Sequence, residues 1–303
     1  MGKNIAFIGL GHMGGPMAAN LVKAGHRVSG FDLAPEALET ARAQGIEVAG
    51  SAAAAAAGAD VVISMLPAGR HVLDAYQGRD GLLDAARPGS IFLDCSTIAV
   101  KDARIAHDLA TAYGHRSLDA PVSGGVTGAA NGTLTFMVGG SADDFGEAEP
   151  ILAAMGGRIV HCGGPGAGQA AKLCNNMILG ISMIAVSEAF VLGEKLGLSN
   201  QALFDVASAA SGQCWALTTN CPVPGPVPDS PANRDYQPGF AGALMAKDLG
   251  LAVQAFEATG VKARLGSLAE EIYRDFAEGE GAGRDFSGII NEIRATSGAE
   301  ALP

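Results

Sequence analysis

Residues 4–14 read NIAFIGLGHMG, in which a short apolar run is followed by three spaced glycines. The run predicts a strand over residues 4–8, and the pattern GxGxxG leads into a predicted helix over residues 13–24. In such a turn the first glycine allows a tight bend, the second lets backbone approach a pyrophosphate, and the third lets helix and strand pack closely. The helix N–H groups then face the phosphates. We therefore expect a dinucleotide to contact Gly9, Leu10, Gly11, His12, Met13 and Gly14.

The next predicted strand, residues 27–31, ends in Phe31 and is followed by Asp32, 18 residues after the last glycine of the turn. A carboxylate at this place accepts hydrogen bonds from the adenosine ribose and repels a 2′-phosphate. Phe31 and Asp32 are therefore predicted cofactor contacts, and NAD is favoured over NADP. Two alternatives remain open, namely glycines that serve packing alone and an aspartate that only caps the following helix.

Short apolar runs alternate with helical patterns through residue 164, which is typical of βαβ units and a parallel sheet. The alanine run after Ser51 is interpreted as a short helix with a serine N-cap. We predict an α/β domain of Rossmann type over residues 1–164, with a mostly parallel sheet. Its further strands are predicted at residues 61–66, 91–94, 116–119, 134–138 and 158–162.

Strand patterns stop after Gly163, and a proline-free stretch follows whose apolar residues recur at helical spacing. We predict an all-α second domain over residues 165–303, which begins with a long interdomain helix over residues 168–196. Six prolines between residues 221 and 239 predict a loop without regular structure, which in a compact domain is more often functional than idle. Further helices are predicted at residues 200–209, 243–259, 265–277 and 286–294.

Composition narrows the class of function. The 303 residues include 20 basic and 31 acidic side chains, with a net charge of −11 and no basic cluster, so we expect no nucleic-acid or anionic-membrane partner. Apolar runs such as residues 177–186 are interrupted well before the roughly 18 residues of a membrane span, and no targeting peptide is visible, so a cytoplasmic location is expected. Five cysteines without a CxxC pair and six scattered histidines favour reduced thiols and no metal. A small-molecule ligand is favoured.

Two further candidate segments follow predicted strands, at the edge where ligands of open α/β sheets bind. Leu66 and Pro67 close one strand, and Ser96 and Thr97 follow the next. We expect cofactor contacts at these four residues. A cap for the helix that begins near Lys101 is an equally good interpretation of the two hydroxyl residues.

A serine and two glycines, Ser123, Gly124 and Gly125, come after another predicted strand. Successive bare N–H groups beside a hydroxyl make a suitable nest for a substrate carboxylate. A simple turn is the alternative interpretation.

Lys172 lies in the apolar sequence AAKLC of the interdomain helix. Burial disfavours the charged ammonium, so a lysine there can exchange a proton near neutral pH. Asn176 projects from the same helix face, and the pair could hold a hydroxyl oxygen between an amine and an amide. A lysine whose amine reaches solvent is the alternative. Lys247 and Asp248 form a second charged pair within an apolar helix, for which a buried ion pair or surface charges are the alternatives.

Four segments together resemble the β-hydroxyacid dehydrogenase family, in order and at suitable spacing over nearly the whole chain. They are GLGHMGGPMAANLVKAGH from Gly9, DAPVSGG from Asp119, GAGQAAKLCNN from Gly166, and the Gly239-Phe240 pair with MAKDLGLA from Met245. Within the family, the Cys214-Trp215 pair, PVPG at residues 222–225 and DYQPGF at residues 235–240 are most similar to members that oxidise 3-hydroxyisobutyrate.

This resemblance implies NAD-dependent oxidation of 3-hydroxyisobutyrate to methylmalonate semialdehyde, a step of valine catabolism. It implies a Rossmann-type domain followed by a helical domain, in homodimers or homotetramers. Lys172 would be the general base, Asn176 would help hold the substrate, and the Ser-Gly-Gly turn would bind its carboxylate. The remaining implied contacts are Thr97 and Lys247 to the cofactor, and Asp248, Phe240 and Trp215 around the substrate.

Two other functions stay open. A sister enzyme, such as a tartronate semialdehyde reductase or a succinic semialdehyde reductase, would share the four segments. The methyl group of the substrate discriminates weakly between these enzymes, because one methyl group in a pocket is worth only about 1 to 3 kcal/mol. A non-catalytic dinucleotide sensor would need the first segment alone. The presence of Lys172, Asn176 and the Ser-Gly-Gly turn favours an enzyme.

Overall fold

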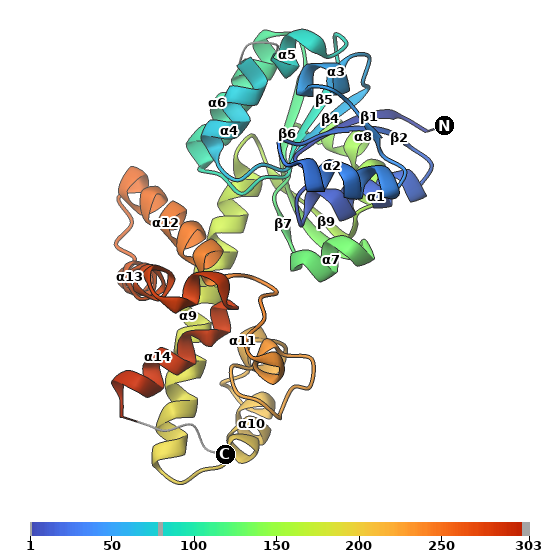
Figure 1. Ribbon diagram of the computed structural model, residues 1–303. Helices are drawn as coiled ribbons and strands as arrows, with labels where there is room; N and C mark the ends of the chain where they lie inside the picture. The colour runs from blue at the N-terminus through green and yellow to red at the C-terminus, as the bar shows by residue number, and fades with distance from the viewer. Residues whose placement is uncertain (1, 78–80, 299–303) are drawn as a thin grey trace. The chain divides into compact units, whose positions relative to one another are not determined.

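The computed structural model describes residues 2–77 and 81–298. Residue contacts divide the chain into two compact units, Met1–Lys172 and Leu173–Pro303, called unit 1 and unit 2 below. The division falls inside helix α9 (Ala167–Lys195), whereas β9 (Gly156–Gly163) is the last strand of the described residues and the predicted boundary lies at residue 164 (Figure 1). The first turn of α9 is part of unit 1 because it packs against the sheet: a Cβ on Gly168 would lie 2.3 Å from a backbone oxygen of the sheet.

Unit 1 is built on one mostly parallel sheet, as predicted. Within the described residues it has nine strands in the order β3-β2-β1-β4-β5-β6-β8-β7, with β9 paired to β8. The strands from β3 to β6 are parallel and follow the order 3-2-1-4-5-6 of dinucleotide-binding folds, whose ligand crosses the switch point beside β1. The strands are β1 (Asn4–Ile8), β2 (Arg27–Phe31), β3 (Glu47–Val48), β4 (Val61–Ser64), β5 (Ile91–Asp94), β6 (Arg116–Asp119), β7 (Val122–Ser123), β8 (Leu134–Gly139) and β9 (Gly156–Gly163).

Helices cover both faces of this sheet, because its parallel strands are apolar on both sides. On β1, Ile5 and Phe7 belong to the core shared with α1, α2 and α8, whereas Ala6 and Ile8 belong to the core shared with α3 to α6 (Figure 1). The helices of unit 1 are α1 (Gly14–Lys23), α2 (Pro35–Ala43), α3 (Ala52–Ala56), α4 (Gly69–Gln77), α5 (Leu82–Ala85), α6 (Val100–Ala112), α7 (Gly125–Asn131) and α8 (Ala142–Leu152).

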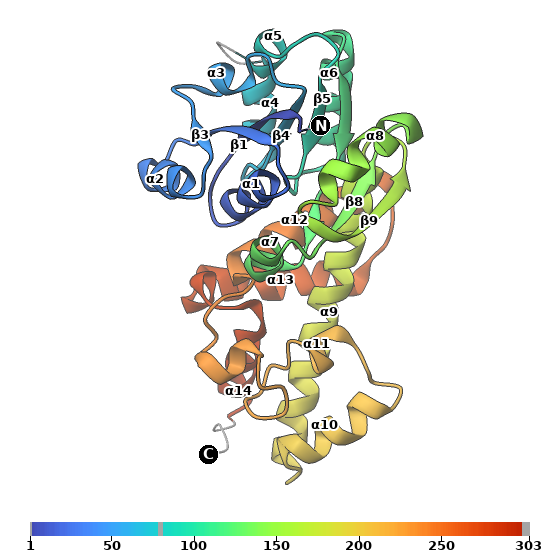
Figure 2. The same ribbon diagram turned by 90° about the vertical axis from the view of Figure 1, so that its right-hand side faces the viewer.

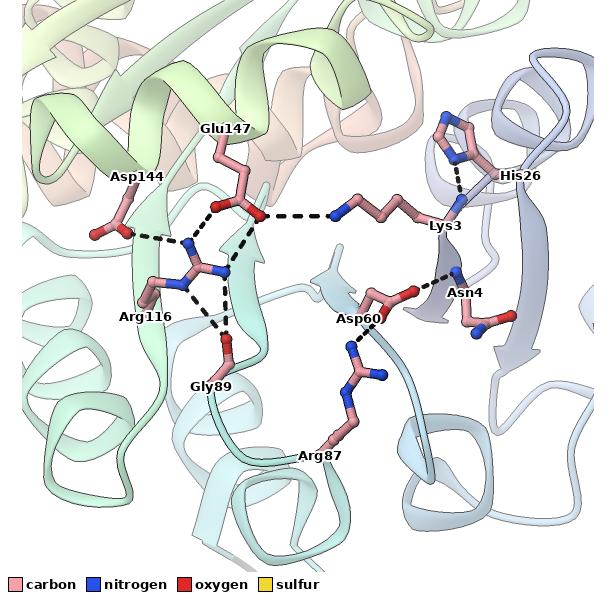
Figure 3. Close-up of polar contacts among 9 residues, drawn as sticks. All are labelled: Lys3, Asn4, His26, Asp60, Arg87, Gly89, Arg116, Asp144 and Glu147. Atoms are coloured by element: carbon pink, nitrogen blue, oxygen red, sulfur yellow. Dashed lines mark hydrogen bonds and ion pairs between the residues drawn. The ribbon is translucent and has the colours of Figure 1, made fainter. Parts of the chain in front are cut away.

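Ion pairs join the elements at the amino edge of the sheet (Figure 3). Arg116, the first residue of β6, donates to Glu147 of α8, and the Lys3 ammonium lies 3.7 Å from the same carboxylate. Asp60, just before β4, pairs with Arg87. The Arg116 hydrogen bond lowers the pKa of Glu147. Because the side chains of Lys3, Arg116 and Glu147 are 38 to 42% exposed, each of their pairs contributes little to stability.

Unit 2 is helical and is organised around α9 (Figure 2). Met183 and Ile184 of α9 pack with α12 and α13, and Phe190 and Val191 pack with α11 and the proline-rich segment. Among the described residues α9 alone is long and apolar enough to cross a membrane. Both core clusters of unit 2 include α9, as expected of a core helix. The helices are α10 (Asn200–Ala209), α11 (Trp215–Thr218), η1 (Pro231–Arg234), α12 (Gly242–Thr259), α13 (Arg264–Glu278), η2 (Glu280–Gly283), η3 (Phe286–Gly288) and α14 (Ile289–Thr296).

The structure corrects the expected elements in several places, among them the helices α11 and η2, which were not predicted. The two-residue strands β3 and β7 were not predicted, because so short a segment has no periodic pattern. The segment with six prolines, expected to lack regular structure, holds the 3-10 helix η1, which Pro231 can begin because a first helical position needs no N–H donor. The helix expected over residues 286–294 starts as the 3-10 turn η3 and continues as α14 to Thr296.

Candidate functional site

Each glycine of the turn after β1 serves a different need. Gly9 has a φ of +93°, and a Cβ there would lie 2.3 Å from the Met65 carbonyl oxygen. A Cβ on Gly14 would lie 1.9 Å from the Gly9 oxygen, so glycine lets α1 begin this close to the strand. A Cβ on Gly11 would meet no atom of the described residues within 4 Å, which leaves its exposed backbone accessible to a ligand. The predicted bend at Gly9 and the predicted packing contact at Gly14 are present, whereas the approach of a pyrophosphate to Gly11 stays a prediction.

The start of α1 favours an anion through its dipole. Among the described residues no side chain caps this helix, and its first turn holds no acidic residue. The Gly15 N–H is bonded to the Gly11 carbonyl oxygen and Pro16 has no N–H, so the positive end of the helix dipole, more than a set of free donors, favours an anion here. Together with the space at Gly11, this end of the helix fits the pyrophosphate of NAD.

Asp32 connects the glycine turn to the segment after β2. Its Oδ2 accepts a hydrogen bond from the Leu10 N–H at 2.6 Å, and its Oδ1 accepts one from the Ala34 N–H at 2.8 Å. The side chain is half-buried, and each oxygen keeps a second lone pair for a ribose hydroxyl. The N-cap of α2 is Ala34, and Asp32 bonds to no N–H group of the described residues Pro35–Ala43, so the alternative of an aspartate that only caps the following helix is wrong. The ribose contact stays a prediction.

A buried carboxylate that the sequence analysis missed lies at the end of β5. Asp94 Oδ1 accepts hydrogen bonds from Ser64 Oγ at 2.8 Å and Ser96 Oγ at 2.6 Å. Ser96 Oγ in turn accepts one from the Leu66 N–H at 2.8 Å. Burial raises the pKa of Asp94 to about 6, although these donors favour the ionised form. This network ties the loops after β4 and β5 to each other.

The Ser96 hydroxyl is thus used inside the protein. The N-cap of α6 is Ala99, and the Ser96 hydroxyl is bonded to Asp94 and the Leu66 N–H, so the alternative in which Ser96 caps this helix is wrong. Ser96 is fully buried, which makes it a support of the loop. Cofactor contacts at Leu66, Pro67 and Thr97 stay predictions.

Asp119, the last residue of β6, anchors the first turn of α9. Its Oδ1 accepts a hydrogen bond from the Gly166 N–H at 2.7 Å, and its Oδ2 accepts one from the Gln169 N–H at 2.9 Å. Burial raises the pKa of Asp119, and these N–H groups oppose the rise. Lys172, which is buried, follows three residues after Gln169 on the anchored helix.

The turn predicted to bind a carboxylate lies between β7 and α7. Gly124 and Gly125 have φ values of +133° and +61°, a region that favours glycine. Gly124 is exposed, and Ser123 is half-buried beside it. Binding of a carboxylate at this turn stays a prediction.

Unit 2 brings together three of the predicted residues. Asn176 Nδ2 donates to Asp248 Oδ2 at 2.6 Å, and Lys247 Nζ lies 3.3 Å from Asp248 Oδ1. Asn176 and Asp248 are both buried. The ion pair foreseen as an alternative for Lys247 and Asp248 is present, and it leaves the Lys247 side chain 34% exposed. A cofactor contact of Lys247 stays a prediction.

The two aromatic candidates of unit 2 differ in their surroundings. Trp215 begins α11 and is 53% exposed, whereas Phe240 is half-buried and packs edge-on against Phe286 at 5.8 Å between ring centres. Asp285, a second carboxylate missed from the sequence, accepts hydrogen bonds from the N–H groups of Gly239 and Phe240 at 3.0 Å each. It fixes the backbone that carries Phe240.

The predicted site residues fall into two groups, one in each unit. Among the described residues no three His, Cys, Asp or Glu side chains lie together as a metal site requires. Polar residues that end apolar strands, Asp94 and Asp119, could have been found from their position in the sequence. Unit 1 holds the glycine turn, Phe31, Asp32, Leu66, Pro67, Ser96, Thr97, Ser123, Gly124, Gly125 and Lys172, and unit 2 holds Asn176, Trp215, Phe240, Lys247 and Asp248.

Family models match both parts of the chain. Residues 4–164 match the NAD binding domain of 6-phosphogluconate dehydrogenase. Residues 166–293 match a model described as the NAD-binding domain of NADP-dependent 3-hydroxyisobutyrate dehydrogenase. Fold, glycine turn and family models together define an NAD-dependent oxidoreductase.

Curated relatives and a solved structure cover almost the whole chain. A probable 3-hydroxyisobutyrate dehydrogenase of Mycobacterium tuberculosis is 58% identical over 97% of this chain and 99% of its own length. An NAD-dependent L-serine dehydrogenase of Pseudomonas aeruginosa is 50% identical over 98% of this chain and 99% of its own. The solved structure of M. tuberculosis 3-hydroxyisobutyrate dehydrogenase with L-serine aligns with a TM-score of 0.93 at 58% identity, over 97% of this chain and all of that one. The chain belongs to the 3-hydroxyisobutyrate dehydrogenase family, which confirms the resemblance inferred from the four segments.

Proposed function

We propose that this dehydrogenase oxidises 3-hydroxyisobutyrate to methylmalonate semialdehyde, with Lys172 as the base that takes the hydroxyl proton. The observation that carries the proposal is the placement of Lys172: a buried lysine lies on the turn of α9 that Asp119 fastens to the carboxyl end of β6. This is the edge of an open α/β sheet at which ligands bind.

NAD, when bound, accepts the hydride that leaves the hydroxyl-bearing carbon. The neutral amine of Lys172 removes the proton from the hydroxyl oxygen, and the electrons of the O–H bond form the new C=O bond. Asn176 donates one N–H to Asp248, which fixes its amide and leaves the second N–H for the substrate oxygen.

The remaining roles complete the proposed site. Ser123, Gly124 and Gly125 bind the substrate carboxylate and orient it, and Trp215 and Phe240 face its methyl group. Thr97 and Lys247 contact NAD, and Asp32 accepts the ribose hydroxyls and favours NAD over NADP. The enzyme works in valine catabolism in the cytoplasm, as a homodimer or homotetramer.

L-Serine is the second candidate substrate. One relative is named for its action on L-serine, and the aligned M. tuberculosis structure was solved with this amino acid. L-Serine has the same hydroxymethyl and carboxylate groups as 3-hydroxyisobutyrate, with an ammonium group in place of the methyl. Removal of the ammonium group from water is unfavourable unless an opposite charge pairs with it, which favours the methyl-bearing substrate.

The test is NADH formation, followed at saturating NAD, with 3-hydroxyisobutyrate, L-serine, glycerate and 4-hydroxybutyrate as separate substrates. We expect the highest kcat/KM with 3-hydroxyisobutyrate. A higher value with L-serine would make this a serine dehydrogenase, and a preference for glycerate or 4-hydroxybutyrate would identify a sister enzyme. NADH binding without turnover of any of the four would identify a dinucleotide sensor.

A further inference from the structure

Gln169 is fully buried in the first turn of α9, and both ends of its amide are bonded to one loop of unit 1. Its Nε2 donates to the Ser96 carbonyl oxygen at 2.7 Å, and its Oε1 accepts from the Ile98 N–H at 3.1 Å. The side chain therefore pairs with the backbone of the Ser96–Ile98 loop in the way that a neighbouring strand would.

The contact requires a glutamine. A primary amide presents a donor and an acceptor on one planar group, which the Ser96 carbonyl and the Ile98 N–H both need. An ionised carboxylate at this place could not donate to the carbonyl. An apolar side chain would leave a buried carbonyl and a buried N–H without their partner, which is unfavourable.

Further hydrogen bonds hold Ser96 and the backbone of Gln169 in place. The Ser96 hydroxyl is bonded to Asp94 and to the Leu66 N–H, and the Gln169 N–H is bonded to Asp119. A continuous series of hydrogen bonds therefore runs from the loop after β4, through the loop after β5, into α9. Burial, which raises the pKa of Asp94 to about 6, shows how far this series is removed from solvent.

Lys172 is three residues further along the same helix, about 4.5 Å along its axis and about 60° around it from Gln169. A shift or rotation of the first turn of α9 would move the Lys172 amine by a similar amount. In enzymes, misplacement of a reacting group by about 1 Å can lower the rate by about two orders of magnitude.

We propose that Gln169 is a positioning residue, which holds the turn of α9 that carries Lys172 against the Ser96–Ile98 loop. The loop includes Thr97, the predicted cofactor contact, so one side chain sets the base and the cofactor-binding loop in a single geometry before substrate arrives. The inference rests on the proposed function, in which Lys172 is the base.

Two variants test the role. Gln169→Leu removes both amide contacts at similar volume, and we expect kcat/KM to fall by about tenfold or more and the dissociation constant of NADH to rise severalfold. Gln169→Glu keeps the shape of the side chain, but its carboxyl can donate to the Ser96 carbonyl only when protonated. We therefore expect the ratio of kcat/KM in this variant to that of the unsubstituted enzyme to fall as pH rises. Asp94 and Asp119 titrate in both proteins, so the ratio isolates the new carboxyl.

Gln201→Glu is the matched control, because Gln201 lies on the exposed surface of α10 and its amide bonds to Asp205 at 2.8 Å. We expect its ratio to stay flat with pH and its NADH affinity to stay unchanged. Active-enzyme concentration and the thermal midpoint, Tm, are measured for every protein. A purely structural role would lower Tm but leave kcat, KM and NADH affinity per folded enzyme within about twofold, and this result would overturn the proposal.

If Gln169→Leu fails to fold, the pH series of Gln169→Glu decides, and a flat ratio overturns the proposal. The outcome is separable from that of the proposed function. An unsubstituted enzyme that turns over none of the hydroxy acids would contradict the proposed function. The NADH dissociation constants would then still decide whether Gln169 positions the loop: a rise supports it, and an unchanged value overturns it.

Discussion

The two edges of the unit 1 sheet are held by opposite kinds of polar contact. At the amino edge, Lys3, Arg116 and Glu147 form ion pairs between side chains that are more than a third exposed (Figure 3). At the carboxyl edge, Asp94 and Asp119 are buried and accept hydrogen bonds from hydroxyl and backbone N–H groups.

The difference reflects what each edge must do. Exposed ion pairs join strands and helices without desolvation, but salt screens them and their side chains stay adjustable. Buried carboxylates bonded to neutral donors hold loops in one geometry. Their side chains have little freedom to adopt another conformation. We infer that the buried carboxylates of the carboxyl edge lower the stability of the fold but place the ligand-binding loops precisely. The ion pairs of the amino edge serve only to assemble the sheet.

The largest effect is expected at the base. Lys172→Ala should lower kcat by about three orders of magnitude, because the proton of the hydroxyl loses its acceptor, while NADH binding stays nearly intact. Steady-state kinetics and NADH fluorescence measure the two quantities. Lys195→Ala, at the exposed end of the same helix, is the control and should keep its activity. Near-normal turnover of the Lys172 variant would remove this residue from the mechanism.

The cost of burial at the carboxyl edge should show in the pH dependence of stability. The pKa of Asp94 is about 6 in the folded protein and near 3.8 when the group is free, so folded protein binds more protons between these values. Its ionisation then destabilises the fold as pH rises from about 4 to about 6, by roughly 3 kcal/mol in total. Asp94→Asn cannot ionise, so it should gain that amount of unfolding free energy relative to the unsubstituted protein over this range. Parallel urea titrations at pH 4.5 and 7 measure about 2 kcal/mol of this gain, the part that accrues above pH 4.5. Equal differences at both pH values would contradict the raised pKa.

A smaller effect is expected at the cofactor end of the same edge. Asp32→Arg should shift the ratio of kcat/KM for NAD to that for NADP toward NADP by about tenfold, since an arginine attracts the 2′-phosphate that a carboxylate repels. It should also lower activity with NAD, because the hydrogen bonds to the Leu10 and Ala34 N–H groups are lost. Asp32→Asn separates loss of charge from loss of shape. An unchanged cofactor ratio in both variants would count against a ribose contact.

The smallest effect is expected at the amino edge. Glu147→Gln removes the ion pairs with Arg116 and Lys3 and should lower the free energy of unfolding by about 0.5 to 1 kcal/mol, with kcat and KM unchanged. The loss should shrink in 1 M salt, where exposed charges are screened. A change in kcat would show that this edge does influence the site, and the contrast between the edges would fail.

Much of the fold followed from local pattern. The strands β1, β2, β5 and β6 have the predicted bounds. The helices α9, α10, α12, α13 and α14 were predicted to within a few residues, whereas α11, η1 and η2 were not predicted. The strands β3 and β7 were not predicted, since a strand of two residues shows no periodic pattern in the sequence around it.

The site was predicted less completely. The glycine turn, Lys172 and Asn176 stand out because their residue types are unusual for their local sequence. Gln169 and Asp285 look ordinary in the chain, and their importance lies in partners up to 73 residues away.

The sequence by itself thus determined the class of fold, the nucleotide turn and the position of the charged residues along α9, because backbone conformation and helical periodicity act over a few residues. Tertiary structure alone decided which polar groups meet. It buried Asp94 between two serines, placed Asp119 under the first turn of α9, and joined Gln169 to the loop of Ser96. Hydrogen bonds between residues far apart in the chain depend on how strands are ordered in the sheet, and that order is a property of the whole packed unit.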